Sequence, residues 1–280
     1  MQLQINGIDL DIISVGGLYT CVQFPQYKIA MDLGIAPRSS FNKSHIFFTH
    51  AHADHIAGVT RHCSSRKLLG LPPPTYVIGQ EDAENFVNFM QSAGKLFRSD
   101  MLYNLEVVEP KQILQIHKQL SVQSYRSIHT MPCQGYIIQE SRTKLKQEFL
   151  SLSGRELQQL RESGVELSET IHMPIVSYTG DTTIDTFHRE KILQRLQVLV
   201  TEVTFFDDSV SPKEAKRRGH MHIDDLAQNE DLFPQPAIVL MHSSSRFSKE
   251  EITHICQKKL SQEMLKRIHI VPNNLPLENF

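Results

Sequence analysis

Short apolar runs separated by turn residues characterise the first fifty positions of the chain. The runs are rich in β-prone side chains, and Gly or Pro lies between them, which predicts strands. The last of these runs, HIFFT, is short enough to form a buried strand. The predicted strands lie at residues 2–5, 11–15, 19–24, 28–32 and 45–49.

Helical and strand patterns alternate along the remainder of the chain. Apolar residues with helical spacing predict an amphipathic helix over residues 81–94. Two capping boxes predict an exposed helix over residues 153–164 and a last helix from Ser248 to about Leu265. Because no linker or repeat divides this pattern, residues 1–280 are predicted to form a single α/β domain. Further strands are predicted within residues 71–79, 120–128, 135–139, 174–181, 196–205, 237–242 and 267–271.

Composition places the chain among ordinary globular proteins. Its 280 residues can bury a sizeable core, and a content of 40% hydrophobic and 21% charged residues excludes a disordered chain. Four cysteines without a C-x-x-C pair indicate free thiols in a reducing compartment. No apolar run reaches the ~20 residues needed to cross a bilayer, and the first residues lack the pattern of a signal peptide. We therefore expect a cytoplasmic protein without a membrane partner.

Histidine is the one unusual component, because the chain has 14 histidines while its net charge of −2 shows no general basicity. The segment FFTHAHADHIAG places His50, His52, Asp54 and His55 directly after the buried strand. His50 and His52 can aim their rings the same way from an extended turn. A hydrogen-bonded turn would need neither three imidazoles nor a carboxylate beside them, so this cluster indicates a metal site.

Three other predicted strands also end in a potential metal ligand, namely His129, Asp181 and His242. A single residue of this kind is more often a capping or hydrogen-bonded group than a functional one. Loops at strand ends, however, are where a rigid sheet usually presents a site. The three residues are therefore candidates to complete the cluster at residues 50–55.

The pattern H-x-H-x-D-H after an apolar strand resembles the metallo-β-lactamase superfamily. Within it, the chain is similar to ribonuclease Z, in its short plant-like form, through E-x-T-F at residues 202–205, G-H at residues 219–220 and H-x-S-x-R at residues 242–246. The segments LSGRELQQLRESGVE and YTGDTT carry the same resemblance. It implies a four-layer αββα sandwich with metals at one edge of its two sheets.

The resemblance also implies a two-zinc site with a bridging carboxylate. Imidazole and carboxylate ligands suit zinc, whereas magnesium or calcium would take mostly oxygen. The implied activity is removal of the 3′ trailer from precursor tRNA by a metal-activated hydroxide, which leaves a 3′-hydroxyl on the tRNA. The implied ligands are His50, His52 and His129 for one zinc ion, Asp54, His55 and His242 for the other, and Asp181 between them.

Further catalytic roles follow from the same resemblance. Asp54, which touches both metal and water, is expected to orient the attacking hydroxide. His220, with Glu202 beside it, matches the family's proton donor to the leaving oxygen. His222 lies two residues further on and competes for that role. Arg246 matches a phosphate contact that Ser244 assists.

Basic runs flanking the predicted site are expected to bind the phosphates of tRNA. Many members of the family that this chain resembles carry a long arm with a Gly-Pro-rich tip, whereas here about forty residues without a Gly-Pro pair join Tyr136 to Tyr178. A reduced arm around residues 140–172 is therefore expected to contact the tRNA body. The basic residues are Arg61, Arg66 and Lys67, then Arg142, Lys144 and Lys146, and then Lys213, Lys216, Arg217 and Arg218.

Two other functions are compatible with the motifs. One is a hydrolase of the same fold that acts on small substrates, such as a phosphodiesterase, which would have no need for the segment RTKLK. The other is a metal-free RNA-processing subunit, which the complete ligand set disfavours. Because members of the family are commonly dimers, a homodimer is also expected.

Overall fold

Two sheets of seven strands each form the centre of the computed structural model, which describes residues 1–273. In the first sheet the strands follow one another in chain order. They are β1 (Gln2–Ile5), β2 (Ile8–Val15), β3 (Tyr19–Phe24), β4 (Ile29–Met31), β5 (His45–Phe47), β6 (Thr75–Gly79) and β7 (Asn104–Val108).

The second sheet also keeps its strands in chain order and has the same plan. In each sheet the first four strands pair antiparallel and the last four pair parallel. The strands of the second sheet are β8 (Ile113–His117), β9 (Leu120–Ser127), β10 (Cys133–Leu145), β11 (Ser168–Tyr178), β12 (Val198–Glu202), β13 (Ala237–Met241) and β14 (Ile268–Ile270).

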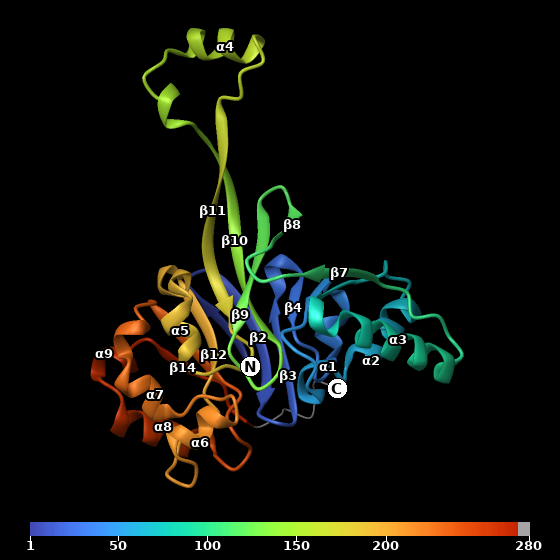
Figure 1. Cartoon of the computed structure of the whole chain (residues 1–280), viewed down its shortest axis with the longest axis vertical. Helices are drawn as coiled ribbons and strands as arrows, with labels where there is room; N and C mark the ends of the chain where they lie inside the picture. The colour runs from blue at the N-terminus through green and yellow to red at the C-terminus, as the bar shows by residue number, and fades with distance from the viewer. Residues whose placement is uncertain (274–280) are drawn as a thin grey trace.

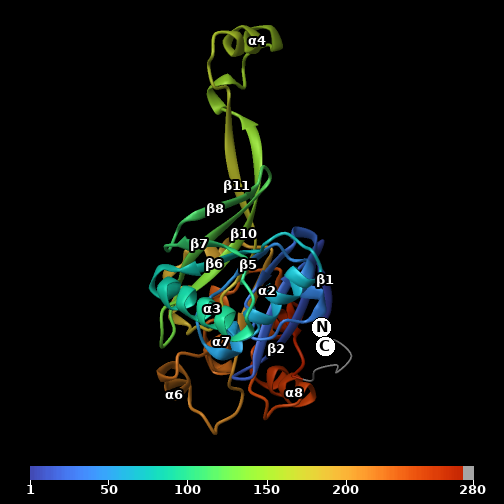
Figure 2. The ribbon, with the colours of Figure 1, turned by 90° about the vertical axis from the view of Figure 1, so that its right-hand side faces the viewer.

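Helices cover the outer face of each sheet, because parallel strands need crossover connections. Figure 1 and Figure 2 show α1 (Ala53–Ile56), α2 (Val59–Leu68) and α3 (Ala83–Phe97) over the first sheet. The second sheet is covered by α5 (Asp185–Arg189), α6 (Pro212–Arg217), α7 (Ile223–Gln228), α8 (Lys249–Lys259) and α9 (Gln262–Leu265). Short 3₁₀ helices lie at Pro25–Tyr27, Arg38–Asn42, Gln80–Asp82, Gln147–Phe149, Lys191–Arg195 and Glu230–Leu232.

The main core lies between the two sheets, and alternation along the strands explains why both faces are apolar. Phe47 and Val200 point into this core, whereas their neighbours Ile46 and Leu199 pack under the outer helices. The order of layers is therefore helix, sheet, sheet and helix. This confirms the predicted four-layer αββα sandwich.

A two-stranded arm rises from the body of the protein (Figure 1). β9 accompanies β10 only as far as Glu140, and beyond it β10 pairs with β11 alone, from Ser141 opposite His172 to Leu145 opposite Ser168. The tip carries α4 (Gly154–Glu162), which begins with the predicted capping box.

Most predicted elements form, but the structure differs from the prediction at several points. The predicted last helix is two helices, because the chain leaves the helical conformation at Leu260 and Ser261 caps a new one. β7 and β8 were not predicted, since they lie at the open edges of the sheets and carry exposed residues such as Ile113. No helix within residues 1–273 has the length and hydrophobicity needed to cross a membrane. The four cysteines are buried free thiols, as predicted.

Candidate metal centre

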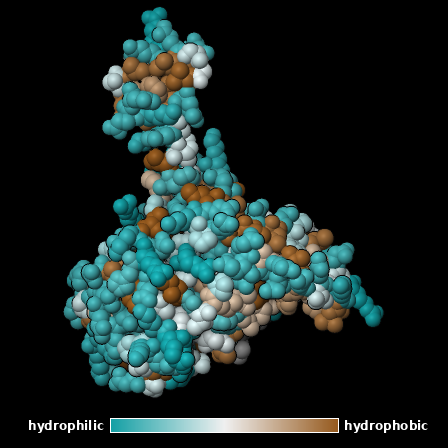
Figure 3. Space-filling model, in the orientation of Figure 1, coloured by the Kyte–Doolittle hydropathy of each residue, from teal (hydrophilic) through white to brown (hydrophobic). Residues whose placement is uncertain are grey.

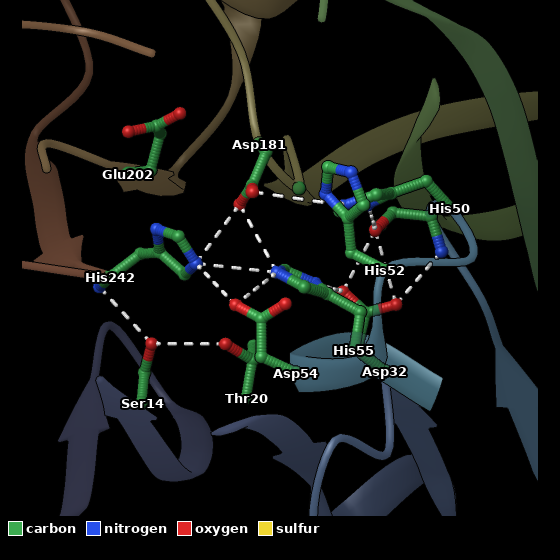
Figure 4. Close-up of polar contacts among 12 residues, drawn as sticks. Ser14, Thr20, Asp32, His50, His52, Asp54, His55, Asp181, Glu202 and His242 are labelled. Carbon is green, nitrogen blue, oxygen red and sulfur yellow. Dashed lines mark hydrogen bonds and ion pairs between the residues drawn. The ribbon is translucent and has the colours of Figure 1, made fainter. Parts of the chain in front are cut away.

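The loops that follow β5, β9, β11 and β13 bring the predicted ligands together at one edge of the sandwich (Figure 4). Their nitrogen and oxygen atoms form three overlapping groups, each with all atoms within 4.8 Å of one another. Asp181 belongs to two of these groups. The groups are His50, His52, His129 and Asp181, then Asp54, His55 and His242, and then Asp181, His220 and His242.

Asp181 lies between the two sets of predicted ligands. Its Oδ2 atom is 3.7 Å from Nε2 of His50 and 4.0 Å from Nε2 of His129. Its Oδ1 atom is 3.3 Å from Nε2 of His55 and 3.4 Å from Nε2 of His242. One carboxylate oxygen therefore faces each set, which is the arrangement expected of a bridging ligand.

The outer nitrogen of each buried imidazole contacts a fixed partner. Nδ1 of His129 donates to the Gly219 carbonyl at 2.8 Å, and Nδ1 of His50 lies 2.9 Å from the Thr49 hydroxyl. That hydroxyl donates its own proton to Asp32, so it accepts from His50. Such partners direct the remaining nitrogen, Nε2, toward the centre and orient the ring.

Asp32 is a functional residue that the sequence analysis missed. Its buried carboxylate accepts hydrogen bonds from the Thr49 amide at 2.8 Å, from the Tyr178 hydroxyl at 2.7 Å and from Nδ1 of His55 at 2.7 Å. Asp32 directly follows β4, so the strand-end rule that identified the other candidates could have found it. It has a φ of +58°, a conformation that few residues other than glycine adopt.

The polar atoms of this site call for a cation. Oδ1 of Asp181 is buried and has no hydrogen-bond partner among residues 1–273, which ordinarily costs about 1–3 kcal/mol or more. Burial would lower the pKa of His55, but the carboxylates of Asp181 and Asp32 raise it well above its usual value. The two carboxylates therefore favour positive charge at this position, which a bound metal ion would supply.

The remaining charges also suit metal binding. Burial, together with the charge on His55, lowers the pKa of His50 well below its usual range. Burial would raise the pKa of Asp181, but the imidazoles of His242 and His55 hold it well below that range. Asp181 is therefore ionised and His50 neutral, which are the forms that bind metal.

Asp54 is aimed at the centre by a backbone contact. Its Oδ2 atom accepts from the Gly17 amide at 2.9 Å and lies 3.3 Å from Nε2 of His242. Gly34 packs directly against the backbone of Asp54, since a Cβ atom at residue 34 would lie 1.7 Å from the Asp54 carbonyl oxygen. Only glycine fits at residue 34.

His220 lies beside this centre and is paired with Glu202. Nδ1 of His220 is 2.8 Å from Oε1 of Glu202, and its ring stacks on that of His242 with centroids 5.6 Å apart. Burial would lower the pKa of His220, but Glu202 raises it to about 9. Glu202 itself is buried and also accepts from the Thr204 hydroxyl at 2.6 Å.

His222 has a different place and role. Its Nδ1 accepts a hydrogen bond from the Asp224 amide at 3.1 Å, which caps α7. Its Nε2 lies 3.1 Å from the Asp207 carbonyl. Of the two candidates for proton donation, the structure brings His220 to the centre and turns His222 away from it.

Arg246 and Ser244 lie in the loop after β13, near His242. The Arg246 guanidinium donates to the Ser209 hydroxyl at 2.7 Å and to Asp207 at 3.2 Å, and it lies 4.9 Å from the centre of the Phe247 ring. It remains partly exposed, so its fork is held in place while still open to solvent. Ser244 is half-buried, and its amide donates to the Thr204 carbonyl.

One of the predicted phosphate contacts is wrong. Arg66 is only 4% exposed and donates to the backbone carbonyls of Phe41, Lys43 and Pro72, so it joins loops of the body. Lys67 donates to Ser99 and to the backbone of Asp100. Arg66 and Lys67 therefore join parts of the body, while Arg61 is exposed and lies over the Phe41 ring.

The other predicted basic residues lie on exposed elements. Lys144 is 3.9 Å from Glu169 across the arm, and Lys216 on α6 is 2.8 Å from Asp185. On the arm, Arg142 is near Glu140. At the end of α6 and just after it, Arg217 and Arg218 both contact Glu214. Lys146 follows β10, and Lys213 lies in the first turn of α6.

Comparison with known proteins relates this chain to one family. No family model matches it. It is 36% identical to tRNase Z TRZ1 of Arabidopsis thaliana over 252 residues, which cover 89% of this chain and 90% of that protein. It is 33% identical to the chloroplastic tRNase Z TRZ2 of the same plant, with 95% of this chain and 76% of that protein covered.

Solved structures agree on the fold. The metallo-β-lactamase fold protein YhfI from Bacillus subtilis superposes with a TM-score of 0.64 at 15% identity, covering 96% of this chain and 98% of that one. The short form of human tRNase Z superposes with a TM-score of 0.59 at 15% identity, covering 95% and 97%. Identities this low establish only the shared fold, whereas the similarity to the plant proteins along most of both chains establishes more: the chain belongs to the tRNase Z family.

Proposed function

We propose that this protein is an endoribonuclease that removes the 3′ trailer from precursor tRNA. The observation that carries the proposal is the similarity to proteins named tRNase Z over most of the chain, in a fold that gathers the complete candidate ligand set at one edge. A metal-free binding protein would have no reason to keep this set together.

We further propose that the centre holds two zinc ions. In a tetrahedral zinc site with Zn–N distances of about 2.0–2.1 Å, two ligand atoms lie roughly 3.3–3.4 Å apart. Nε2 of His55 and Nε2 of His242 lie 3.3 Å apart, as do Nε2 of His242 and Oδ2 of Asp54. When bound, the ions would act as Lewis acids that activate water and stabilise charge on the phosphate.

The chain's own residues then have distinct tasks in the reaction. Asp54, oriented by the Gly17 amide, accepts a proton from the attacking water. His220, kept protonated by Glu202, donates a proton to the ribose O3′ as the bond between phosphorus and O3′ breaks. The products are a tRNA with a free 3′-hydroxyl and a trailer with a 5′-phosphate.

Arg246 is proposed to bind the phosphate that is cleaved, with Ser244 beside it. Asp207 and Ser209 hold the guanidinium, so it loses little side-chain freedom when it forms bidentate hydrogen bonds to two phosphate oxygens. The arm around residues 140–172 is proposed to contact the body of the tRNA, away from the centre. Its candidate contacts are Arg142, Lys144 and Lys146, and those on and after α6 are Lys213, Lys216, Arg217 and Arg218.

A homodimer is proposed because large apolar side chains are exposed on the body, and a cytoplasmic location is proposed because the cysteines are free thiols. Leu68 at the end of α2 is 88% exposed, and Leu96 near the end of α3 is 79% exposed. Figure 3 shows hydrophobic side chains gathered on the side of the body formed by these helices. Exposed apolar patches of this kind mark interaction surfaces. The four buried free thiols suit a reducing compartment.

The experiment that tests the function uses labelled precursor tRNA. Purified protein should cut at the 3′ side of the tRNA, chelator should abolish the cut, and added zinc should restore it. The Asp181→Ala variant is the control for contaminating nuclease, since it lacks the central ligand. Hydrolysis of bis(p-nitrophenyl) phosphate without any cut in precursor tRNA would instead indicate a hydrolase of small substrates.

A further inference from the structure

A mostly apolar cavity of about 340 Å³ adjoins the loop that carries the candidate metal ligands. One wall is formed by Ala51, Ala53 and Ile56. Ala51 lies between His50 and His52 in the sequence, and Ala53 between His52 and Asp54. The cavity and the metal centre therefore share a backbone segment, although the reaction described above makes no use of the cavity.

The first half of α3 also lines the cavity and contributes an exposed aromatic ring. Phe86 and Phe89 both line the cavity, but Phe86 is buried whereas Phe89 is 46% exposed. A large aromatic side chain with this exposure, beside an apolar space, offers a face for stacking. Asp82 and Asn85 add polar groups to an otherwise apolar lining.

This combination fits a nucleobase. Proteins bind single-stranded RNA by stacking unpaired bases on aromatic rings and by forming hydrogen bonds with their edges. The carboxylate of Asp82 can accept from an exocyclic amino group, and the amide of Asn85 can both donate and accept. A volume of about 340 Å³ is in the range of small-molecule sites.

We infer that this cavity receives a base of the RNA strand next to the cleaved bond, with Phe89 as the stacking surface. The inference rests on the proposed function, because it requires an RNA substrate at the metal centre. A second copy of the chain is the competing occupant. The apolar residues most suited to that contact, Leu68, Leu96 and Phe97, lie outside the cavity lining, whereas the cavity itself carries polar groups and adjoins the metal loop.

The test compares variants of two exposed apolar residues, one in the cavity lining and one outside it. Phe89→Ala should raise the KM for precursor tRNA by roughly 5- to 100-fold, the usual effect of losing one stacked base. Phe89→Tyr should keep the wild-type KM, because tyrosine retains the planar ring. Phe89→Leu should raise the KM, because leucine has no planar face. Ile113→Ala, at the open edge of the second sheet and outside the cavity lining, should leave KM unchanged. Hydrolysis of bis(p-nitrophenyl) phosphate should be unchanged in every variant.

Substrates that lack one base locate the nucleotide. With the wild-type enzyme, an abasic residue at one position beside the cleaved bond should raise the KM as much as Phe89→Ala raises it for the intact precursor tRNA. The KM of the Phe89→Ala variant should not rise further on that abasic substrate, since the stacked pair is already absent.

Three results would overturn the inference. The first is an unchanged KM for Phe89→Ala in a wild-type enzyme that cuts precursor tRNA. The second is that the effects of Phe89→Ala and of an abasic residue on KM multiply at every position tested, which would mean that the ring and the base do not interact. The third is a change in molecular mass by light scattering for Phe89→Ala, which would assign the cavity to a contact between chains. Failure of the wild-type enzyme to cut precursor tRNA would refute the proposed function and this inference with it.

Discussion

The carboxylate of Asp32 contacts Nδ1 of His55 at 2.7 Å, in a position where neither side chain is exposed to solvent. His55 is thereby fixed with its other nitrogen toward the metal centre. The same carboxylate accepts from Thr49, whose hydroxyl contacts His50. A single residue outside the ligand set therefore orients one imidazole in each half of the site.

Replacing Asp32 should weaken metal binding although Asp32 is not a ligand. We expect Asp32→Ala to lower zinc affinity about 10- to 100-fold, the usual cost of losing a partner that orients a metal-binding histidine. Competition with a chromophoric chelator measures this. The control is Tyr178→Phe, which removes one hydrogen bond to Asp32 but keeps the carboxylate, and it should have a smaller effect. Wild-type affinity in Asp32→Ala would contradict the proposed role.

The position of Asp181 between the two halves predicts that both metal ions depend on it. Asp181→Ala should lower the zinc content from about two ions per chain to well below one, because each half loses an oxygen ligand. His242→Ala should keep one ion, since His242 groups with Asp54 and His55 and is absent from the group of His50, His52 and His129. Elemental analysis of protein purified without chelator distinguishes these results. Wild-type protein with at most one ion would disprove the dinuclear centre.

The different positions of His220 and His222 predict separable effects. His220→Ala should retain zinc and affinity for precursor tRNA but lose roughly 10²- to 10⁴-fold in kcat, the usual contribution of a general acid. His222→Ala should mainly destabilise the protein, by about 1 kcal/mol, because it removes the cap of α7. Single-turnover cleavage and thermal unfolding measure the two effects. A larger loss of kcat in His222→Ala would reverse the assignment.

The clustering of the candidate ligands could be predicted from the sequence because the information is largely local, while the complete set followed from the resemblance to ribonuclease Z. His50, His52, Asp54 and His55 lie within one turn-and-helix segment, and the remaining ligands follow apolar runs that form strands. Once strands are packed in sheets, their ends meet at common edges. The pattern of the sequence therefore places the ligands together without any knowledge of distances.

A strand-end position can mark a residue such as Asp32 as a candidate, but a role that depends on tertiary contacts cannot be predicted in this way. Asp32 acquires its role through Thr49 and His55, which lie 17 and 23 residues away in the chain. The opposite error concerns Arg66, because a basic run is usually solvated, yet tertiary packing buries this guanidinium against carbonyls. Choosing between His220 and His222 likewise required the path of the backbone into α7.

The arm lies away from the candidate metal centre, so its proposed contact with RNA can be tested separately from the chemistry. Beyond Glu140 its two strands leave the body, and Arg142 and Lys144 make only exposed ion pairs, with Glu140 and Glu169. Exposed pairs contribute roughly 0–1 kcal/mol, so replacing the basic residues should leave the arm folded. Figure 1 shows that the arm projects away from the sheets that carry the metal centre.

Replacing Arg142, Lys144 and Lys146 together by alanine should weaken binding of precursor tRNA and flatten its salt dependence. The slope of log K against log salt should fall in magnitude by up to roughly 0.7–0.9 for each phosphate that the arm no longer neutralises. Hydrolysis of bis(p-nitrophenyl) phosphate should stay the same, because the metal centre is untouched. The double replacement of Lys258 and Lys266 by alanine, on α8 and just after α9, is a control for general loss of charge. An equal loss of activity on both substrates would show that the arm shapes the metal centre. An unchanged salt slope would indicate that the basic residues of α6, and not those of the arm, contact the tRNA.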